Sequence, residues 1–185
     1  MAREIEIKFA VDDEEKMLRK LLAFGAEKVC DGLEHNIVFD NGEIRKKGIL
    51  LRLRKTGDKS VLTFKTNIRK AEFKEADEIE IGVSDFQKVK EILEGLGYEA
   101  WWIYEKQKTK FVLGDVTIAL DRLPFGTFIE IEGSEGGIRR TVERLGLDLK
   151  KGIRETYLEL YQNRCKEKGI EMENLIFWRK AKVRL

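Results

Sequence analysis

Charged and apolar side chains alternate along the first predicted strand of the chain. In Glu4-Ile5-Glu6-Ile7-Lys8 two carboxylates and an ammonium recur at every second residue, so an extended backbone places them side by side on one face. Carboxylate oxygens are ligands for hard divalent cations such as Mg²⁺ and Mn²⁺. A half-buried strand with a solvated charged face shows the same alternation, so this strand alone leaves both interpretations open.

The same alternation returns in five later segments, each with charge of essentially one sign. The acidic positions are Glu4, Glu6, Glu78, Glu80, Glu130 and Glu132, and the basic ones are Arg52, Arg54, Lys65, Lys106, Lys108 and Lys110. Solvated strand faces would mix the two signs, because like charges on neighbouring positions repel. The segregation therefore predicts that the charged faces line a shared interior.

Such an interior suits one kind of ligand. Clustered carboxylates repel one another unless they bind a cation. Clustered Arg and Lys side chains also repel one another unless they bind a polyanion. A chain of phosphates has the negative charge and the oxygen geometry to bind them. A metal bound between carboxylates and phosphates satisfies both sets, which predicts phosphoryl or nucleotidyl transfer without a protein nucleophile.

Eight antiparallel strands are predicted to position these residues, and they fit either an open sheet packed on helices or a closed barrel. The segregated charges favour the barrel, with charged faces inward and helices packed on the apolar outside. The predicted fold class is therefore α+β, a closed eight-stranded antiparallel β-barrel forming a tunnel. The segments predicted as strands include 4–9, 28–40, 72–83, 98–113, 116–123 and 127–132, with a hairpin that carries Arg52, Arg54, Thr63 and Lys65.

Four helices are predicted between or after the strands. One begins at Asp12 or Asp13 and stops at Gly25, and another begins at Ser84 or Asp85. The others span about 138–145 and 154–168, after a glycine-rich loop that contains Gly136. We expect one domain over residues 1–164 and a basic and apolar tail over 165–185 that forms a docking helix.

Composition limits the classes of function. The 185 residues are 42% hydrophobic, enough for one sizeable core, and 36 Lys and Arg against 34 Asp and Glu give a net charge of only +2. This balance argues against a nucleic-acid partner. No apolar run approaches a membrane span, and Cys30 and Cys165 are isolated, so we expect reduced thiols, a cytoplasmic location and no membrane partner. The scarcity of Asn, Gln, His and Cys beside abundant Lys and Glu, with a single proline, resembles the composition of thermophile proteins.

The ExExK strand of residues 4–8 resembles the signature of the CYTH superfamily, or triphosphate tunnel metalloenzymes. That family includes class IV adenylyl cyclases, thiamine triphosphatases and inorganic triphosphatases. The resemblance continues to about Asn163 through Leu51-Arg52-Leu53-Arg54, Thr63-Phe64-Lys65, Glu78-Ile79-Glu80, Glu105-Lys106-Gln107-Lys108, Asp121-Arg122-Leu123, Phe128-Ile129-Glu130-Ile131-Glu132 and Thr156-Tyr157-Leu158-Glu159-Leu160.

The resemblance implies a tunnel barrel and a role for each matched residue. The implied ligands of Mg²⁺ or Mn²⁺ are Glu4, Glu6, Asp121, Glu130 and Glu132. The implied triphosphate-binding residues are Lys8, Arg52, Arg54, Lys65, Lys106 and Lys108. The implied catalytic set is Glu4, Glu6, Lys8, Glu130 and Glu132, while the roles of Glu78 and Glu80 stay open. Members often pair, so a homodimer is also expected.

The pattern is closest to that of class IV adenylyl cyclases, which convert ATP to cyclic AMP and pyrophosphate. The same residues would serve a thiamine triphosphatase or an inorganic triphosphatase, so the expected partner is a nucleoside triphosphate, thiamine triphosphate or tripolyphosphate. A non-catalytic module that binds polyphosphate is the alternative from another class.

The sequence also departs from the family pattern. Where many members have Asp-x-Tyr-x-Asp, this chain has residues 36–40, Asn-Ile-Val-Phe-Asp, which lose one carboxylate and one phenol. Lys108 stands where Arg is common and Phe111 where Tyr is common. These departures leave the metal set intact but the choice of nucleophile open. His35, the single histidine, is expected to be an ordinary surface or packed residue rather than a general base.

Overall fold

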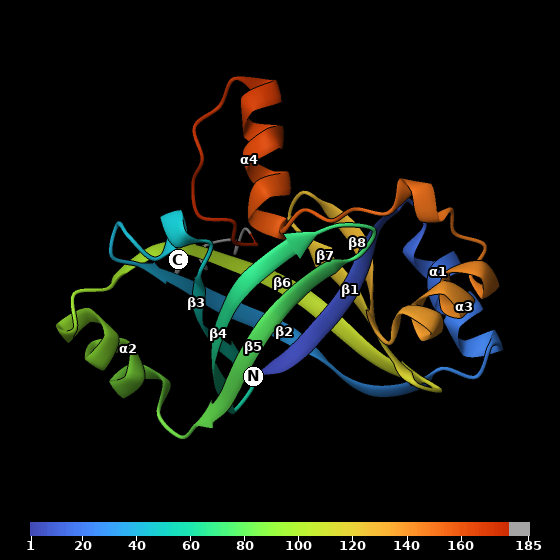
Figure 1. Ribbon diagram of the computed structural model, residues 1–185, viewed down its shortest axis with the longest axis horizontal. Coiled ribbons are helices and arrows are strands. Elements are labelled where there is room, and N and C mark those ends of the chain that lie inside the picture. The colour runs from blue at the N-terminus through green and yellow to red at the C-terminus, as the bar shows by residue number, and fades with distance from the viewer. Residues whose placement is uncertain (178–185) are drawn as a thin grey trace, which may run out of the picture.

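The computed structural model describes residues 1–177, in which eight strands close into an antiparallel barrel (Figure 1). The strand order around the barrel is β1-β5-β4-β3-β2-β6-β7-β8, so the predicted fold class is confirmed. The strands are β1 (Ala2–Val11), β2 (Glu27–Asp40), β3 (Leu50–Thr56), β4 (Lys59–Lys70), β5 (Lys74–Val83), β6 (Glu99–Leu113), β7 (Val116–Leu123) and β8 (Gly126–Gly133). The α-helices are α1 (Glu14–Ala23), α2 (Phe86–Gly95), α3 (Glu135–Arg144) and α4 (Tyr157–Lys168), and two short 3-10 turns, Arg45–Lys47 and Leu149–Lys151, complete the described elements.

Side-chain caps set the starts of the helices. Asp13 accepts a hydrogen bond from the Lys16 backbone nitrogen, and Asp85 accepts one from that of Lys88, so Asp13 and Asp85 are the caps among the predicted alternatives. The third helix starts earlier than expected, because Ser134 caps it and Gly136 and Gly137 are helical rather than part of a loop. A Cβ at Gly137 would lie 2.7 Å from Asp115 Oδ2, so glycine lets the helix pack closely there.

One side of the barrel carries the main hydrophobic core. The outward side chains of β1, β7 and β8, among them Ile7, Ile118 and Ile131, pack in one cluster with Leu21 of α1 and Ile138 of α3. Figure 1 shows α1 and α3 together on this side of the barrel. Burying these chains removes apolar area from water, so the expectation of helices over the apolar outside holds here.

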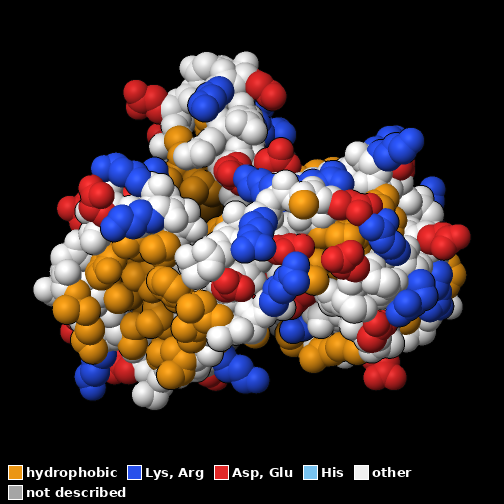
Figure 2. All heavy atoms as spheres, in the orientation of Figure 1, with side chains coloured by type: hydrophobic (Ala, Val, Ile, Leu, Met, Phe, Trp, Pro, Cys, Tyr) orange, Lys and Arg blue, Asp and Glu red, His pale blue; other side chains and the backbone are white. Residues whose placement is uncertain are grey.

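The opposite side of the barrel is less covered. Ile79 and Ile81 of β5 remain 49% and 59% exposed, and Ile92 and Leu96 on α2 or at its end are exposed as well. Figure 2 shows hydrophobic side chains gathered over this region. The prediction that helices cover the whole outside is therefore wrong for β5, because α2 packs instead against Leu53 and its neighbours.

The predicted docking helix of the tail is not observed in the described part of the chain. Residues 165–168 end α4, Gly169 adopts a left-handed conformation, and residues 170–177 form no helix. Leu175 instead forms a parallel bridge to Tyr104, with hydrogen bonds to the backbones of Ile103 and Glu105. This edge of β6 is free because β7 pairs with β6 only from Gln107 onward. Residues 178–185 of the predicted tail lie outside the described residues.

No described helix is long and apolar enough to cross a membrane.

Candidate active site

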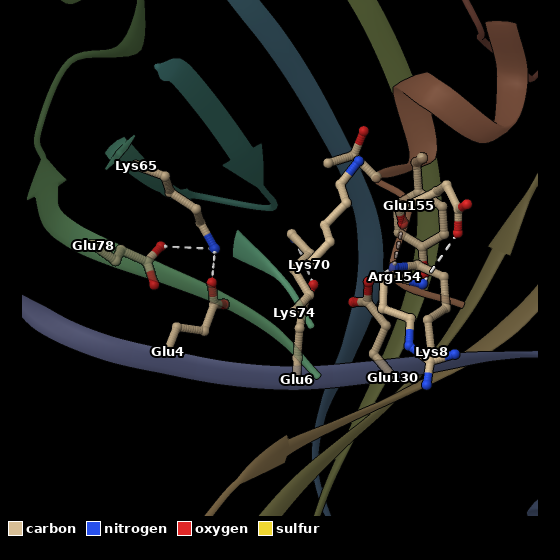
Figure 3. Close-up of polar contacts among 12 residues, drawn as sticks. Glu4, Glu6, Lys8, Lys65, Lys70, Lys74, Glu78, Glu130, Arg154 and Glu155 are labelled. Atoms are coloured by element: carbon tan, nitrogen blue, oxygen red, sulfur yellow. Dashed lines mark hydrogen bonds and ion pairs between the residues drawn. The ribbon is translucent and has the colours of Figure 1, made fainter. Parts of the chain in front are cut away.

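The acidic strand of the signature faces the tunnel as predicted. Because β1 and β8 pair in antiparallel register, Glu6 lies opposite Glu132 and Lys8 lies opposite Glu130. Glu6, Lys8 and Glu130 project into the same space in Figure 3. The alternation of each strand thus brings the predicted metal ligands of two strands, distant in sequence, to neighbouring positions.

Lysine ammoniums neutralise several carboxylates on this side of the tunnel. The Nζ of Lys8 lies 2.8 Å from Glu130 Oε1, and the Nζ of Lys74 lies 2.6 Å from Glu6 Oε1. Lys65 contacts Glu4, and it also lies 3.3 Å from Glu78 Oε1 (Figure 3). The predicted phosphate-binding lysines Lys8 and Lys65 are therefore bound to carboxylates in this structure.

Part of the carboxylate repulsion remains in spite of these pairs. Burial and the charge of Glu6 raise the pKa of Glu4, and burial with the charges of Glu4 and Glu6 raises the pKa of Glu132. In contrast, the pKa of Glu130 lies well below its usual value. Burial raises this pKa, but the positive charges around it, among them Lys8 and Lys106, lower it by more. An added cation would relieve the repulsion among Glu4, Glu6 and Glu132.

Lys106 is the centre of the basic side of the tunnel. Its Nζ lies 2.6 Å from Asp121 Oδ2, 3.6 Å from Glu34 Oε2 and 3.9 Å from Glu130 Oε2. Burial raises the pKa of Asp121 to about 6. Burial also raises the pKa of Glu34, but the charges of Lys106 and Lys108 outweigh it and lower that pKa to about 2.

Arg52 and Lys108 lack a close carboxylate partner. Four other tunnel cations have one, namely Lys8, Arg54, Lys65 and Lys106. Arg52 donates to Tyr104 Oη and Thr63 Oγ1, both at 3.3 Å, and its Nη2 lies 3.9 Å from Glu80 Oε1. Arg54, by comparison, binds the same Glu80 oxygen at 2.8 Å. Lys108 makes no ion pair with any residue that the structure describes. These two cations can therefore bind an anion without first releasing a close carboxylate.

Five buried side-chain atoms lack a hydrogen-bond partner within residues 1–177, and all lie on residues whose strand positions face the tunnel. They are Glu34 Oε2, Asp121 Oδ1, Arg52 Nε and both polar atoms of the Asn36 side chain. A buried polar atom without a partner costs about 1–3 kcal/mol. The two carboxylate oxygens suit a cation, whereas Arg52 Nε and the Asn36 amide nitrogen suit an anion.

The donor chemistry fits a divalent cation such as Mg²⁺ or Mn²⁺, although the carboxylates do not yet converge on one point. No group of three or more His, Cys, Asp or Glu residues in the described chain is arranged to hold a metal ion. The lysine contacts to Glu4 and Glu6 keep these carboxylates turned to their ammonium partners. Metal binding would therefore require at least some of these ion pairs to open.

Aromatic side chains close one end of the tunnel. Tyr157, the first residue of α4, donates its hydroxyl to Asp121 Oδ2 at 2.9 Å, and the Lys8 ammonium lies 4.4 Å from the centre of its ring. Tyr157 packs in a cluster that includes Val38, Trp102 and Leu175. Val38, where many family members have Tyr, is thus part of an apolar wall. Figure 1 shows α4 over this part of the barrel.

Sequence reasoning missed Lys74, Glu34 and Tyr157. Lys74 could have been found, because it shares the alternating face of Glu78 on a strand that was predicted. Glu34 lies on the predicted segment 28–40, but its acidic side chain interrupts an otherwise basic part of the tunnel. Tyr157 reaches the site from a helix that follows the barrel in sequence, and no strand period signals that placement. His35 contacts Glu105 at 3.4 Å and its side chain is 38% exposed, in agreement with the expectation of an ordinary residue.

Comparison with known proteins agrees with this architecture. The CYTH domain model matches residues 2–158. The chain is 26% identical over 170 residues to the Methanocaldococcus jannaschii protein named "Putative adenylate cyclase MJ0240", and the match covers 85% of this chain and 97% of that protein.

Solved structures show the same barrel. The PH1012 protein from Pyrococcus horikoshii OT3 matches with a TM-score of 0.75 and 29% identity, over 85% of this chain and 98% of that one. The Hippeastrum protein "Putative adenylyl cyclase HpAC1", described as having a dominant triphosphatase activity, matches with a TM-score of 0.59 over 98% of this chain and 93% of that one, and at 20% identity it shows likeness of fold alone. The tunnel of inward charges and the match over residues 2–158 together show that this chain belongs to the CYTH domain family.

Proposed function

We propose that the protein is a divalent-metal-dependent enzyme acting on a triphosphate, and that its reaction is the conversion of ATP to cyclic AMP and pyrophosphate. The observation that carries the proposal is the set of buried tunnel atoms without partners. Carboxylate oxygens of Glu34 and Asp121 lack a hydrogen-bond donor, while Arg52 Nε lacks an acceptor. A bound cation would interact with the carboxylate oxygens, and a chain of phosphates would accept a hydrogen bond from Arg52 Nε.

The residues divide into two roles under this proposal. Glu4, Glu6, Glu130 and Glu132, with Asp121 beside them, would hold Mg²⁺ or Mn²⁺ through oxygen. A bound metal would neutralise phosphate charge and polarise a phosphoryl oxygen. The cations Lys8, Arg52, Arg54, Lys65, Lys106 and Lys108 would bind and orient the phosphates.

The protein's part in the reaction is to position the substrate rather than to attack it. In the cyclase reaction the ribose 3′-hydroxyl of ATP attacks the α-phosphorus, and pyrophosphate leaves. The cluster around Tyr157 would exclude water from one end of the tunnel, which favours attack by a hydroxyl of the substrate over attack by water. The name of the Methanocaldococcus jannaschii relative supports the same reaction.

Hydrolysis is the second candidate, because the tunnel cations would serve it equally well. Arg52 and Lys108 recognise phosphates, which tripolyphosphate and thiamine triphosphate carry as well as ATP. In this version a water attacks the terminal phosphorus, the bond from that phosphorus to the bridging oxygen breaks, and the diphosphate leaves while orthophosphate forms. The homodimer, the cytoplasmic location and the absence of nucleic-acid and membrane partners stay predictions.

Product analysis tests the proposal directly. The protein is incubated with Mg²⁺ or Mn²⁺ and ATP, thiamine triphosphate or tripolyphosphate, and the products are separated by chromatography. We expect cyclic AMP and pyrophosphate from ATP. Orthophosphate from any of the three would support the hydrolase instead, while tight binding without turnover would identify a polyphosphate-binding module and overturn the enzyme assignment.

Two carboxylate variants test the metal set. Glu4→Gln and Glu130→Gln each remove one charge at nearly constant volume, and we expect the turnover rate to fall about 100-fold or more because transition-state charge is less well neutralised. Glu27→Gln, on the exposed start of β2, is the matched control and should keep the wild-type rate. Wild-type rates in both tunnel variants would contradict the metal assignment.

A further inference from the structure

Lys74 is a tunnel residue to which the proposed function assigns no role. It begins β5, lies opposite Glu6 in the β1–β5 register, and is only 8% exposed. Its Nζ contacts Glu6 Oε1 at 2.6 Å. Figure 3 shows Lys74 and Glu6 directed toward each other from the two strands.

The Lys74 ammonium binds Glu6, one of the carboxylates expected to bind the metal. Burial lowers the pKa of Lys74, but the charges of Glu6, Glu4 and Glu130 outweigh burial and raise the pKa above its usual value. The ammonium therefore keeps its positive charge beside the Glu6 carboxylate.

A purely structural role explains this pair poorly. Removing two charges from water is expensive, and a buried ion pair contributes little net stability compared with apolar side chains of similar size. A lysine has a flexible stem and a single mobile charge, so it can leave one carboxylate for another anion. Lys70, the cross-strand partner of Lys74 in the β4–β5 register, instead binds Glu159, and both side chains of that pair are partly exposed, which makes Lys70 a useful comparison.

We propose that Lys74 is a resident counterion of the metal site: its ammonium binds the Glu6 carboxylate until a divalent cation binds there, and then turns to the phosphates. This inference rests on the proposed function. Lys74 then opposes metal binding by itself but favours metal and triphosphate together, so that the two ligands bind with positive coupling.

Metal titration of Lys74 variants tests the inference without reference to turnover. Mn²⁺ binding is measured by calorimetry in the absence of triphosphate. We expect Lys74→Met and Lys74→Gln to bind Mn²⁺ about tenfold more tightly than wild type, because the competing positive charge is gone. With Mn²⁺ saturating, the same variants should bind tripolyphosphate about tenfold more weakly.

Matched variants separate this role from a structural one. Lys74→Arg keeps the charge and should keep wild-type Mn²⁺ affinity, and Lys70→Met should change neither affinity. Unchanged or weaker Mn²⁺ binding in a folded neutral variant, as judged by its melting curve, would overturn the inference. Failure of both neutral variants to fold while Lys74→Arg folds would assign Lys74 to stability alone and overturn it as well. If wild type itself binds no Mn²⁺, it is the proposed function that fails.

Discussion

The two sides of the tunnel differ in how well their charges are neutralised from within the protein. On the acidic side, Glu6 and Glu130 each have an ammonium within 2.8 Å. On the basic side, Arg52 lies 3.9 Å from Glu80, and Lys108 makes no ion pair in the described part of the chain. A metal at the acidic side would therefore have to displace an ammonium, whereas Arg52 and Lys108 on the basic side can accept an anion without releasing a close carboxylate.

This difference explains how a charged tunnel can fold before it binds anything. Like charges packed without counterions would destabilise the barrel, because their repulsion is strong in a medium of low dielectric constant. Lysines from β1, β4 and β5 neutralise the acidic side, and Arg52 and Lys108 are left without a close carboxylate.

The largest expected effect comes from a cation that has a close buried partner. Lys106→Met leaves Asp121, which is 0% exposed, without its ammonium. We expect the free energy of unfolding to fall by about 3–5 kcal/mol in urea denaturation at neutral pH, since the buried carboxyl of Asp121 loses its ammonium partner. Lys108→Met on the same strand is the matched control and should lose less than about 1 kcal/mol. Equal losses would remove the distinction between partnered and unpartnered cations.

A pH effect should follow from Glu34. In the folded protein the pKa of Glu34 is about 2, below its usual value. Its contribution to the free energy of unfolding is therefore fully present at pH values above the usual glutamate pKa, and it is lost as the pH falls toward 2. Full loss amounts to about 3 kcal/mol. Unfolding experiments should show wild type more stable than Glu34→Gln at pH 7 and the difference much smaller at pH 2.5. A constant difference over this range would contradict the assignment of the low pKa to the neighbouring cations.

The contribution of Asp121 to stability changes with pH in the direction opposite to that of Glu34. The two contributions must therefore be measured separately in such experiments. Burial raises the pKa of Asp121 to about 6, so its contribution to stability is present below the usual aspartate pKa and is lost as the pH rises through about 6.

A smaller effect is expected at Arg52, whose guanidinium has no close carboxylate partner. Arg52→Met should weaken tripolyphosphate binding about tenfold, because a charge-assisted contact to phosphate is lost, while the melting temperature stays close to that of wild type. Calorimetric titration measures the affinity. Arg52→Lys should recover only part of it, since the ammonium lacks the bidentate geometry. Wild-type affinity in Arg52→Met would place the phosphates elsewhere.

The smallest effect is expected at a surface pair. Arg140 and Asp115 lie 3.1 Å apart, but their side chains are 66% and 56% exposed. Arg140→Met should change the free energy of unfolding by no more than about 0.5 kcal/mol, measured as for Lys106→Met. A loss as large as that of Lys106→Met would show that burial is not what sets the tunnel pairs apart.

The sequence was sufficient to predict which side chains of each strand share a face. Alternation with a period of two is a local property of the extended backbone, so Glu4, Glu6 and Lys8 could be assigned to one face before any pairing was known. The caps were predictable to within one residue, as Asp12 or Asp13 and Ser84 or Asp85, because a cap contacts the backbone only a few residues away; the structure selects Asp13 and Asp85.

Only the tertiary structure decided which charges meet. The contacts of Lys8 with Glu130 and of Lys106 with Asp121 depend on strand order and register, and so does the contact of Lys74 with Glu6. The extended tail at Leu175 and the bare face of β5 depend likewise on which strand edges and surfaces remain uncovered. Local periodicity fixes the direction of a side chain, but its neighbours come from parts of the chain far away in sequence and are known only once the barrel has closed.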